Sequence, residues 1–140
     1  MIFYTDRFVP ENSAACARGP FIFIRPEKRG DRGLLEHERL HVKQWFVVTA
    51  VSIIAYLVFA HVVYQHTQFP VFSITPVFVA LNGVIYTVFQ RYRLYSEVAA
   101  YRVQARYYSD DRRPLFARFI CDKYGLSVNY ADVLADLNRE

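Results

Sequence analysis

The chain has 140 residues, of which 54% are hydrophobic and 21% are charged, and its formal net charge is +4. This length predicts a single domain with one modest core, and the apolar content means that a membrane protein has to be considered. The basic residues are scattered among acidic ones, which argues against a nucleic-acid partner, because phosphate binding needs a basic face or stripe.

The N-terminal flank is predicted to be extended structure that leads into a helix. Residues Phe21–Ile24 form a β-prone run bounded by prolines, and Ile2–Tyr4 could pair with them as a second strand. Asp31 lies in a turn with two glycines and is a plausible N-cap for a helix that continues into Trp45.

The two cysteines and the N-terminal residues indicate in which cellular compartment the protein is expected. Cys16 and Cys121 have no ligand-like spacing, so we expect free thiols in a reducing compartment, with a single disulfide as the less favoured alternative. Residues Met1–Arg7 contain an acid and no basic segment followed by an apolar run, so no signal peptide is expected.

The middle of the chain, residues 44–90, contains no Asp, Glu, Lys or Arg. Within it, Trp45–Tyr64 is almost continuously apolar and would span about 30 Å as a helix. A polar interruption at Gln65–Pro70 separates it from a second apolar stretch, Val71–Phe89. We therefore expect two long antiparallel helices that form an apolar hairpin in a membrane at about residues 45–89.

Basic residues flank this hairpin on both sides, with Arg39 and Lys43 before it and Arg91 and Arg93 after it, whereas the turn carries only Gln and His. The positive-inside rule then predicts that both termini are cytoplasmic. The alternative is a soluble cytoplasmic protein that buries the same helices. A chain of this size has too little core to bury two helices on all faces, which favours the membrane.

The second long helix is expected to continue past Phe89 to about Tyr108. Beyond a break, Leu115–Lys123 and Tyr130–Leu137 are predicted to be two short amphipathic helices, with Gly125 as a stop between them. The expected fold is mainly α, with the apolar hairpin, a short N-terminal β-strand pair and two short C-terminal helices in one domain.

The run His37-Glu38-Arg39-Leu40-His41 carries the clearest chemical signal. Two histidines four apart on a helix project from one face and can reach one metal ion, and the acid next to the first can contact a metal-bound water. Zn²⁺ held by nitrogen or oxygen ligands acidifies its water, and a carboxylate accepts the proton. The alternative is an exposed charged segment on an ordinary helix.

A catalytic zinc needs a third protein ligand. The register of the predicted hairpin indicates which residue supplies it. If the turn centres near Gln68, His41 lies 27 residues before it and Glu97 lies 29 after it, so the two should be neighbours. Glu97 is the only carboxylate between Arg93 and Arg106. The alternative for Glu97 is an ordinary salt bridge with Arg93 at i−4.

The run Leu34–Trp45, with Glu97–Ala100 downstream, resembles the gluzincins, which carry H-E-x-x-H on one helix and E-x-x-A on a later one. It is most similar to minimal single-domain members and to the integral-membrane branch of CAAX-prenyl proteases and their bacterial heat-shock relatives. The resemblance implies that strand Phe21–Ile24 offers its edge to an extended substrate. It also implies three zinc ligands and a general base, namely His37, His41, Glu97 and Glu38.

Several other side chains deserve weighing. The Tyr101 hydroxyl could donate to an oxyanion, and core packing is an equal alternative. Gln44 and Gln104 could each hydrogen-bond a metal ligand or make a buried contact between helices. His61 and His66 lie about 30 Å along the helix from the motif, too far to join the site.

The predicted function is a zinc-dependent metallopeptidase, active or degenerate, that hydrolyses polypeptides at the cytoplasmic membrane surface. The alternative from another class is a non-catalytic membrane or assembly protein in which the metal ties the two long helices together. A soluble peptidase that buries the hairpin in an oligomer is a third possibility.

Overall fold

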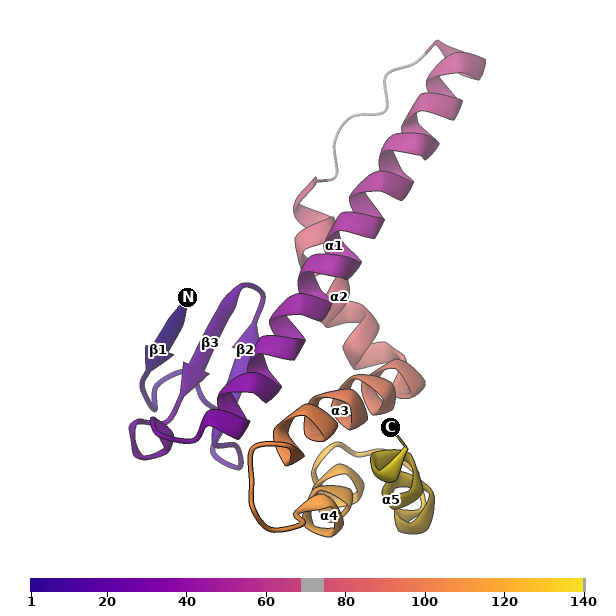
Figure 1. Cartoon of the computed structure of the whole chain (residues 1–140). Coiled ribbons are helices and arrows are strands. Elements are labelled where there is room, and N and C mark those ends of the chain that lie inside the picture. The colour runs from indigo at the N-terminus through magenta and orange to yellow at the C-terminus, as the bar shows by residue number, and fades with distance from the viewer. Residues whose placement is uncertain (69–74, 140) are drawn as a thin grey trace.

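The computed structural model describes residues 1–68 and 75–139, and it is mainly helical with a three-stranded sheet near the N-terminus (Figure 1). The predicted turn residues Phe69 and Pro70, and the start of the second apolar stretch at 71–74, lie outside the described residues. The strands are β1 (Ile2–Tyr4), β2 (Ala15–Arg18) and β3 (Phe21–Ile24). The helices are the short 3-10 helix η1 (Pro26–Lys28), α1 (Arg32–Thr67), α2 (Thr75–Val88), α3 (Gln90–Ala105), α4 (Arg113–Lys123) and α5 (Tyr130–Asn138).

The sheet has the order β1-β3-β2, with β1 parallel and β2 antiparallel to β3. The pairing of β1 with β3 confirms the predicted strand pair, and β2 is an addition. A two-residue turn, Gly19-Pro20, joins β2 to β3; Gly19 has φ +61°, the sign that a type II′ hairpin turn needs at its first position. Because β3 is the central strand, the expectation that Phe21–Ile24 offers a free edge is wrong.

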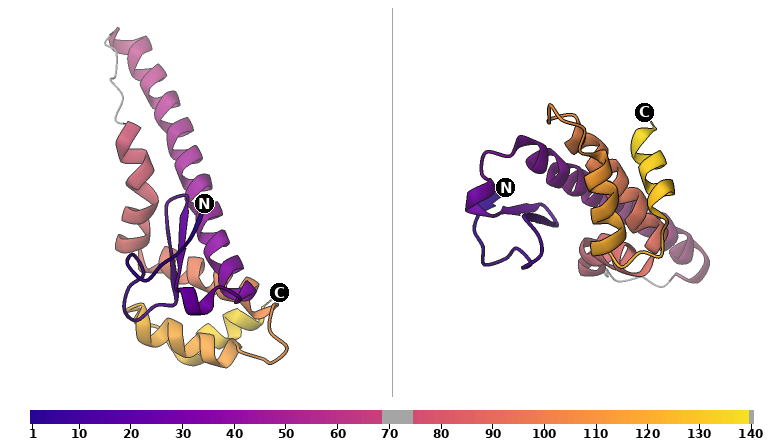
Figure 2. Two further views of the ribbon diagram at one scale, coloured as in Figure 1. Left: turned by 90° about the vertical axis from the view of Figure 1, so that its left-hand side faces the viewer. Right: turned by 90° about the horizontal axis from the view of Figure 1, so that it is seen from below.

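Helix α1 begins as predicted at Asp31, whose Oδ1 accepts a hydrogen bond of 2.9 Å from the backbone N–H of Leu34. It runs for 36 residues and extends well beyond the sheet and the C-terminal helices (Figures 1 and 2). Within the described residues it is the one helix long and apolar enough to cross a membrane, and none of its most apolar window is buried.

The second predicted long helix is broken in two, which corrects the expectation of one helix to about Tyr108. Phe89 has extended backbone angles (φ −98°, ψ 97°), and α3 turns away from α2 at this point (Figure 1). The Arg93 guanidinium donates to the carbonyls of Tyr86 and Thr87 at the end of α2, and to the carbonyl of Tyr124. These bonds satisfy carbonyls that the break leaves without helical partners.

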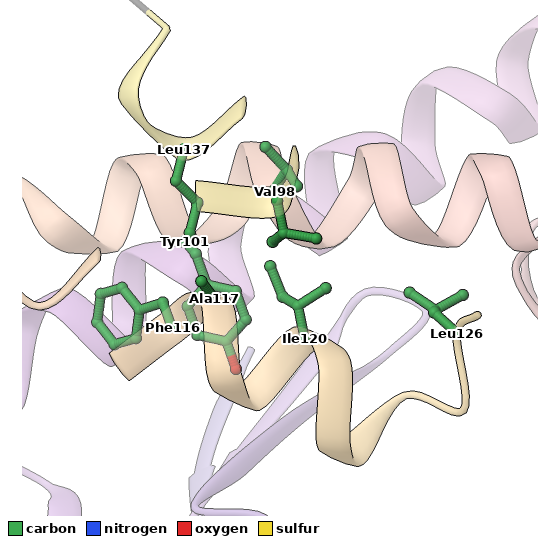
Figure 3. Packing of buried hydrophobic residues seen from close by; sticks show 8 residues of the cluster. Val98, Tyr101, Phe116, Ala117, Ile120, Leu126 and Leu137 are labelled. Carbon is green, nitrogen blue, oxygen red and sulfur yellow. The ribbon is translucent and has the colours of Figure 1, made fainter. Parts of the chain in front are cut away.

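The C-terminal helices α4 and α5 confirm the prediction, and Gly125 between them has φ +60°. They pack against α3 and form the main hydrophobic core with it (Figure 3). Its buried members are Val98, Tyr101, Phe116, Ala117, Ile120, Leu126, Val133 and Leu137. This core fixes α3 from one side and leaves its opposite side to face α1.

A hydrogen-bond chain joins the start of α1 to the end of α3. Tyr108 donates 2.7 Å to Asp31 Oδ1, and Gln104 Nε2 donates 2.9 Å to the Tyr108 hydroxyl. The helices approach closely here because Gly33 has no side chain: a Cβ there would lie 2.9 Å from the Tyr108 ring and 3.1 Å from the Gln104 carbonyl oxygen. Gly33 therefore sets the distance between α1 and α3.

The variant Gly33→Ala is expected to lower the free energy of unfolding by about 1–3 kcal/mol, because the added methyl group overpacks this contact. Gly30→Ala is the matched control, since a Cβ at Gly30 meets no atom within 4 Å. The measurement is denaturant unfolding of both variants in detergent, followed by circular dichroism. Equal stability of the two variants would contradict the proposed close approach.

Candidate metal centre

Three potential ligand atoms converge where α1 faces α3. The Nε2 atoms of His37 and His41 are 3.1 Å apart. Nε2 of His37 lies 3.6 Å from Oε2 of Glu97, and Nε2 of His41 lies 3.5 Å from Oε1 of the same carboxylate. The structure thus brings together the three residues that the sequence analysis put forward as ligands.

These separations fit one small ion. Two ligands at about 2.0–2.1 Å from a tetrahedral zinc are themselves about 3.3 Å apart. The three residues offer ligand atoms that all lie within 4.8 Å of one another. Oε2 of Glu97 is buried and has no hydrogen-bond partner within the described residues, which is costly for a carboxylate oxygen without a cation. The group could therefore hold a metal ion.

The His41 ring is oriented by polar neighbours of its Nδ1 atom, the nitrogen that does not face the other ligands. Its Nδ1 lies 3.1 Å from Oε1 of Gln44, which can only accept, so Nδ1 carries the proton and Nε2 presents its lone pair to the site. Ser96 donates 2.6 Å to the same Gln44 oxygen and lies 3.2 Å from Nδ1. The contact expected from Gln44 is present, and Ser96 is an addition from α3.

His37 is held in its neutral form. Burial lowers the pKa of its imidazole well below the usual value, His41 lowers it further, and the Gln104 side chain opposes this. Its contact with Glu97 is therefore not an ion pair. His37 Nδ1 and Gln104 Oε1 are both buried, and neither has a hydrogen-bond partner within the described residues. A neutral imidazole is the form that binds metal.

Tyr86 of α2 holds the Glu97 carboxylate by donating a hydrogen bond to its Oε1 atom. Tyr124, just after α4, lines the same cleft, and its hydroxyl lies 3.2 Å from that of Tyr101. Arg93, the alternative partner for Glu97, instead donates to backbone carbonyls. The ion-pair alternative for Glu97 therefore finds no support among the described contacts.

Glu38 is only 5% exposed and lies between α1 and the edge of the sheet. Burial, with the negative charge of Glu97 as a second cause, raises the pKa of the Glu38 carboxyl to about 8. A hydrogen bond from the backbone N–H of Ala17 in β2 opposes the rise. Glu38 is thus a buried acid with a raised pKa.

Tyr101 lies behind the ligands, in the core. Its ring packs edge-on against His37 at 4.5 Å and stacks on Phe116 at 4.7 Å, and its hydroxyl lies 3.2 Å from that of Tyr124. Burial raises the pKa of the Tyr101 hydroxyl. The described contacts therefore place Tyr101 as packing support for His37, and its oxyanion role stays a prediction.

A cleft of about 810 Å³ opens over the three ligands and Glu38. Strand β2 and the turn after it form one wall, and α1 and α2 form the others. The wall residues that matter below are Ala17, Arg18, Phe21, Trp45, Asn82 and Gly83. The site is therefore reachable from outside the protein.

The remaining candidates lie apart from this cleft. His61 and His66 are exposed on the distal part of α1. Cys16 and Cys121 are free thiols, as expected. Sequence reasoning missed Tyr86, although in the continuous helix that the sequence predicted it would lie eleven residues, or about three turns, before Glu97 and on the same face.

Comparison of the chain with protein-family models, curated proteins and solved structures gave no significant match.

Metal analysis should find one ion per chain, bound by the three converging side chains. Each single substitution of a ligand is expected to weaken zinc binding by more than about 100-fold, and the three variants are His37→Ala, His41→Ala and Glu97→Ala. This loss is larger than the one expected on removing a residue that only hydrogen-bonds a ligand. His61→Ala, an exposed histidine on the same helix, is the control and should bind as the wild type does. The measurement is competition with a chromogenic chelator. Unchanged affinity in all three ligand variants would refute the site.

The variant Tyr86→Phe should weaken zinc binding by about 10–100-fold, because Glu97 loses a hydrogen bond that orients it. Tyr95→Phe is the control, since Tyr95 is 69% exposed on α3. The same chelator competition tests both. Equal affinities would mean that Tyr86 does not position Glu97.

Proposed function

We propose that this protein is a zinc-dependent, gluzincin-like metallopeptidase anchored in a membrane. The observation that carries the proposal is that His37, His41 and Glu97 face one cleft with a fourth, acidic side chain beside them. Two histidines and a glutamate are the ligand set of one class of catalytic zinc sites, which leave a coordination position open. A bound zinc supplies Lewis-acid chemistry there, by polarising a carbonyl and acidifying water.

Glu38 is suited to the role of general base. It lines the same cleft as the ligands, and its raised pKa of about 8 makes it a better proton acceptor than an exposed carboxylate. The Ala17 N–H keeps the carboxylate facing the cleft. Glu38 takes a proton from the attacking water and can deliver it to the leaving amine.

A polypeptide substrate can be held by the free edge of β2. Arg25 N–H bonds to the carbonyl of Ala14, so in the alternating antiparallel ladder Ala15 and Ala17 direct their backbone groups away from β3. Both residues border the cleft, and because the Ala17 N–H bonds Glu38, the backbone groups of Ala15 and the carbonyl of Ala17 are the ones left for a substrate. An extended peptide could add to this edge and lie across Glu38, so β2 takes the role expected of β3.

The membrane part of the proposal rests on α1. The exposed apolar surface of α1 has to be shielded from water, and α2 lies alongside the middle portion of α1 (Figures 1 and 2). In our proposal α1 and α2 form the antiparallel hairpin in the bilayer. The flanking Lys43 and Arg91 favour cytoplasmic termini and a cytoplasmic cleft. No nucleic acid is proposed as a partner.

The second candidate is a membrane or assembly protein with a structural metal. It is favoured by the fact that the three ligands come from α1 and α3, so a bound ion would tie these helices together. A structural ion would remain bound, and the protein would keep its function, after substitution of Glu38. The two candidates therefore differ in whether Glu38 has chemistry to perform.

The variant Glu38→Gln should keep its zinc and lose about 10²–10⁴-fold in cleavage rate, because the general base is removed while the ligands stay. Glu36→Gln is the control, since Glu36 pairs with Arg39 away from the cleft. The measurement is release of fluorescence from labelled casein by detergent-purified, zinc-loaded protein. Equal rates for the wild type and Glu38→Gln would exclude the base role, and no cleavage by the zinc-loaded wild type would favour the structural alternative.

A further inference from the structure

One end of the sheet exposes apolar side chains next to the base of the long apolar helix. Met1 is 76% exposed, Phe21 43% and Phe3 38%. The Phe3 and Phe21 rings lie 6.1 Å apart, so they form one aromatic patch. Burying such side chains in an apolar environment is favourable by roughly 1.5–3 kcal/mol each.

This patch lies at the level where α1 becomes free of charge. The turn between β2 and β3 packs on Trp45: a Cβ at Gly19 would lie 3.5 Å from the indole ring. The amino group of Met1 donates 3.1 Å to the carbonyl of Pro20, which holds the N-terminus at the same turn. Figure 1 shows this turn and the N-terminus at the end of the sheet toward which α1 extends.

The charges around this level have one sign. Arg18 beside the turn, Lys43 before Trp45 and Arg91 at the start of α3 are all exposed, and none of them forms an ion pair within the described residues. The acids that flank the charge-free segment, Glu38 and Glu97, are both buried in the metal centre. Exposed cations beside aromatic rings complement the surface of an anionic membrane.

We propose that the hairpin tip, Arg18–Phe21, inserts with Met1 and Phe3 into the headgroup region of an anionic bilayer beside α1. This inference rests on the proposed membrane insertion of α1 and adds the sheet as a second contact. The tip also lines the cleft, through Arg18 and Phe21. The insertion therefore holds the mouth of the cleft at the membrane surface, and it resists rotation of the cytoplasmic part about the α1 axis.

The single tryptophan of the chain, Trp45, gives a direct test. The wild type reports the base of α1, and a tip variant with Trp45→Phe and Phe21→Trp reports the hairpin. A control variant with Trp45→Phe and Tyr130→Trp reports α5, at the other end of the molecule (Figure 1). Each full chain is reconstituted in phosphatidylcholine vesicles, with and without phosphatidylglycerol, and quenching by a lipid spin-labelled near its headgroup is measured.

We expect the quenching of the tip variant to equal that of the wild type to within about twofold. This quenching should be stronger in vesicles that contain phosphatidylglycerol, and the control variant should not be quenched. If the wild type is quenched and the tip variant behaves as the control does, the hairpin contact is overturned while the insertion of α1 stands. If the wild type is not quenched either, the proposed membrane insertion fails as well. Phe21→Trp with Trp45 retained gives the tip signal by difference, should the double variant not fold.

Discussion

The interaction on which this structure depends is the approach of three electron-pair donors in a buried position between two helices. The Nε2 atoms of His37 and His41 face each other at 3.1 Å, and a carboxylate of Glu97 lies beside them. Because Gln44 fixes the proton of His41 on the outer nitrogen, no hydrogen is available to bridge these donors on that side. A bound cation would make this arrangement favourable, and the close approach of α1 to α3 at Gly33 keeps the three donors together.

The break between α2 and α3 connects the apolar part of the chain to this centre. The bend at Phe89 redirects the chain, and Arg93 satisfies the carbonyls that the bend exposes. Tyr86, from the apolar side of the bend, reaches across it to Glu97. The position of α2 is thereby coupled to the geometry of the three candidate ligands.

Helical periodicity sufficed to predict that His37 and His41 face the same way, because they are one turn apart. Glu97 was predicted from the register of an unbroken helical hairpin, and it lies beside the histidines although the second helix is broken at Phe89. Strand β2 escaped prediction, since Ala15–Arg18 has no β-branched or aromatic residue and is extended only because β3 pairs with it. The break at Phe89 could not be predicted from a helix-breaking residue, because no Gly or Pro lies next to it. It depends on contacts such as that of Arg93 with a carbonyl 31 residues away, which no local pattern encodes.

The position of Glu38 bears on the choice between a catalytic and a structural metal. A structural zinc closes its coordination with four protein ligands, whereas the group found within the described residues has three and faces a cleft. Keeping a further carboxylate almost fully buried beside them is costly, as its raised pKa shows, and one backbone N–H from Ala17 offsets only part of this cost. A metal that only ties α1 to α3 does not require such an acid, whereas the proposed hydrolysis needs a proton acceptor next to the ion.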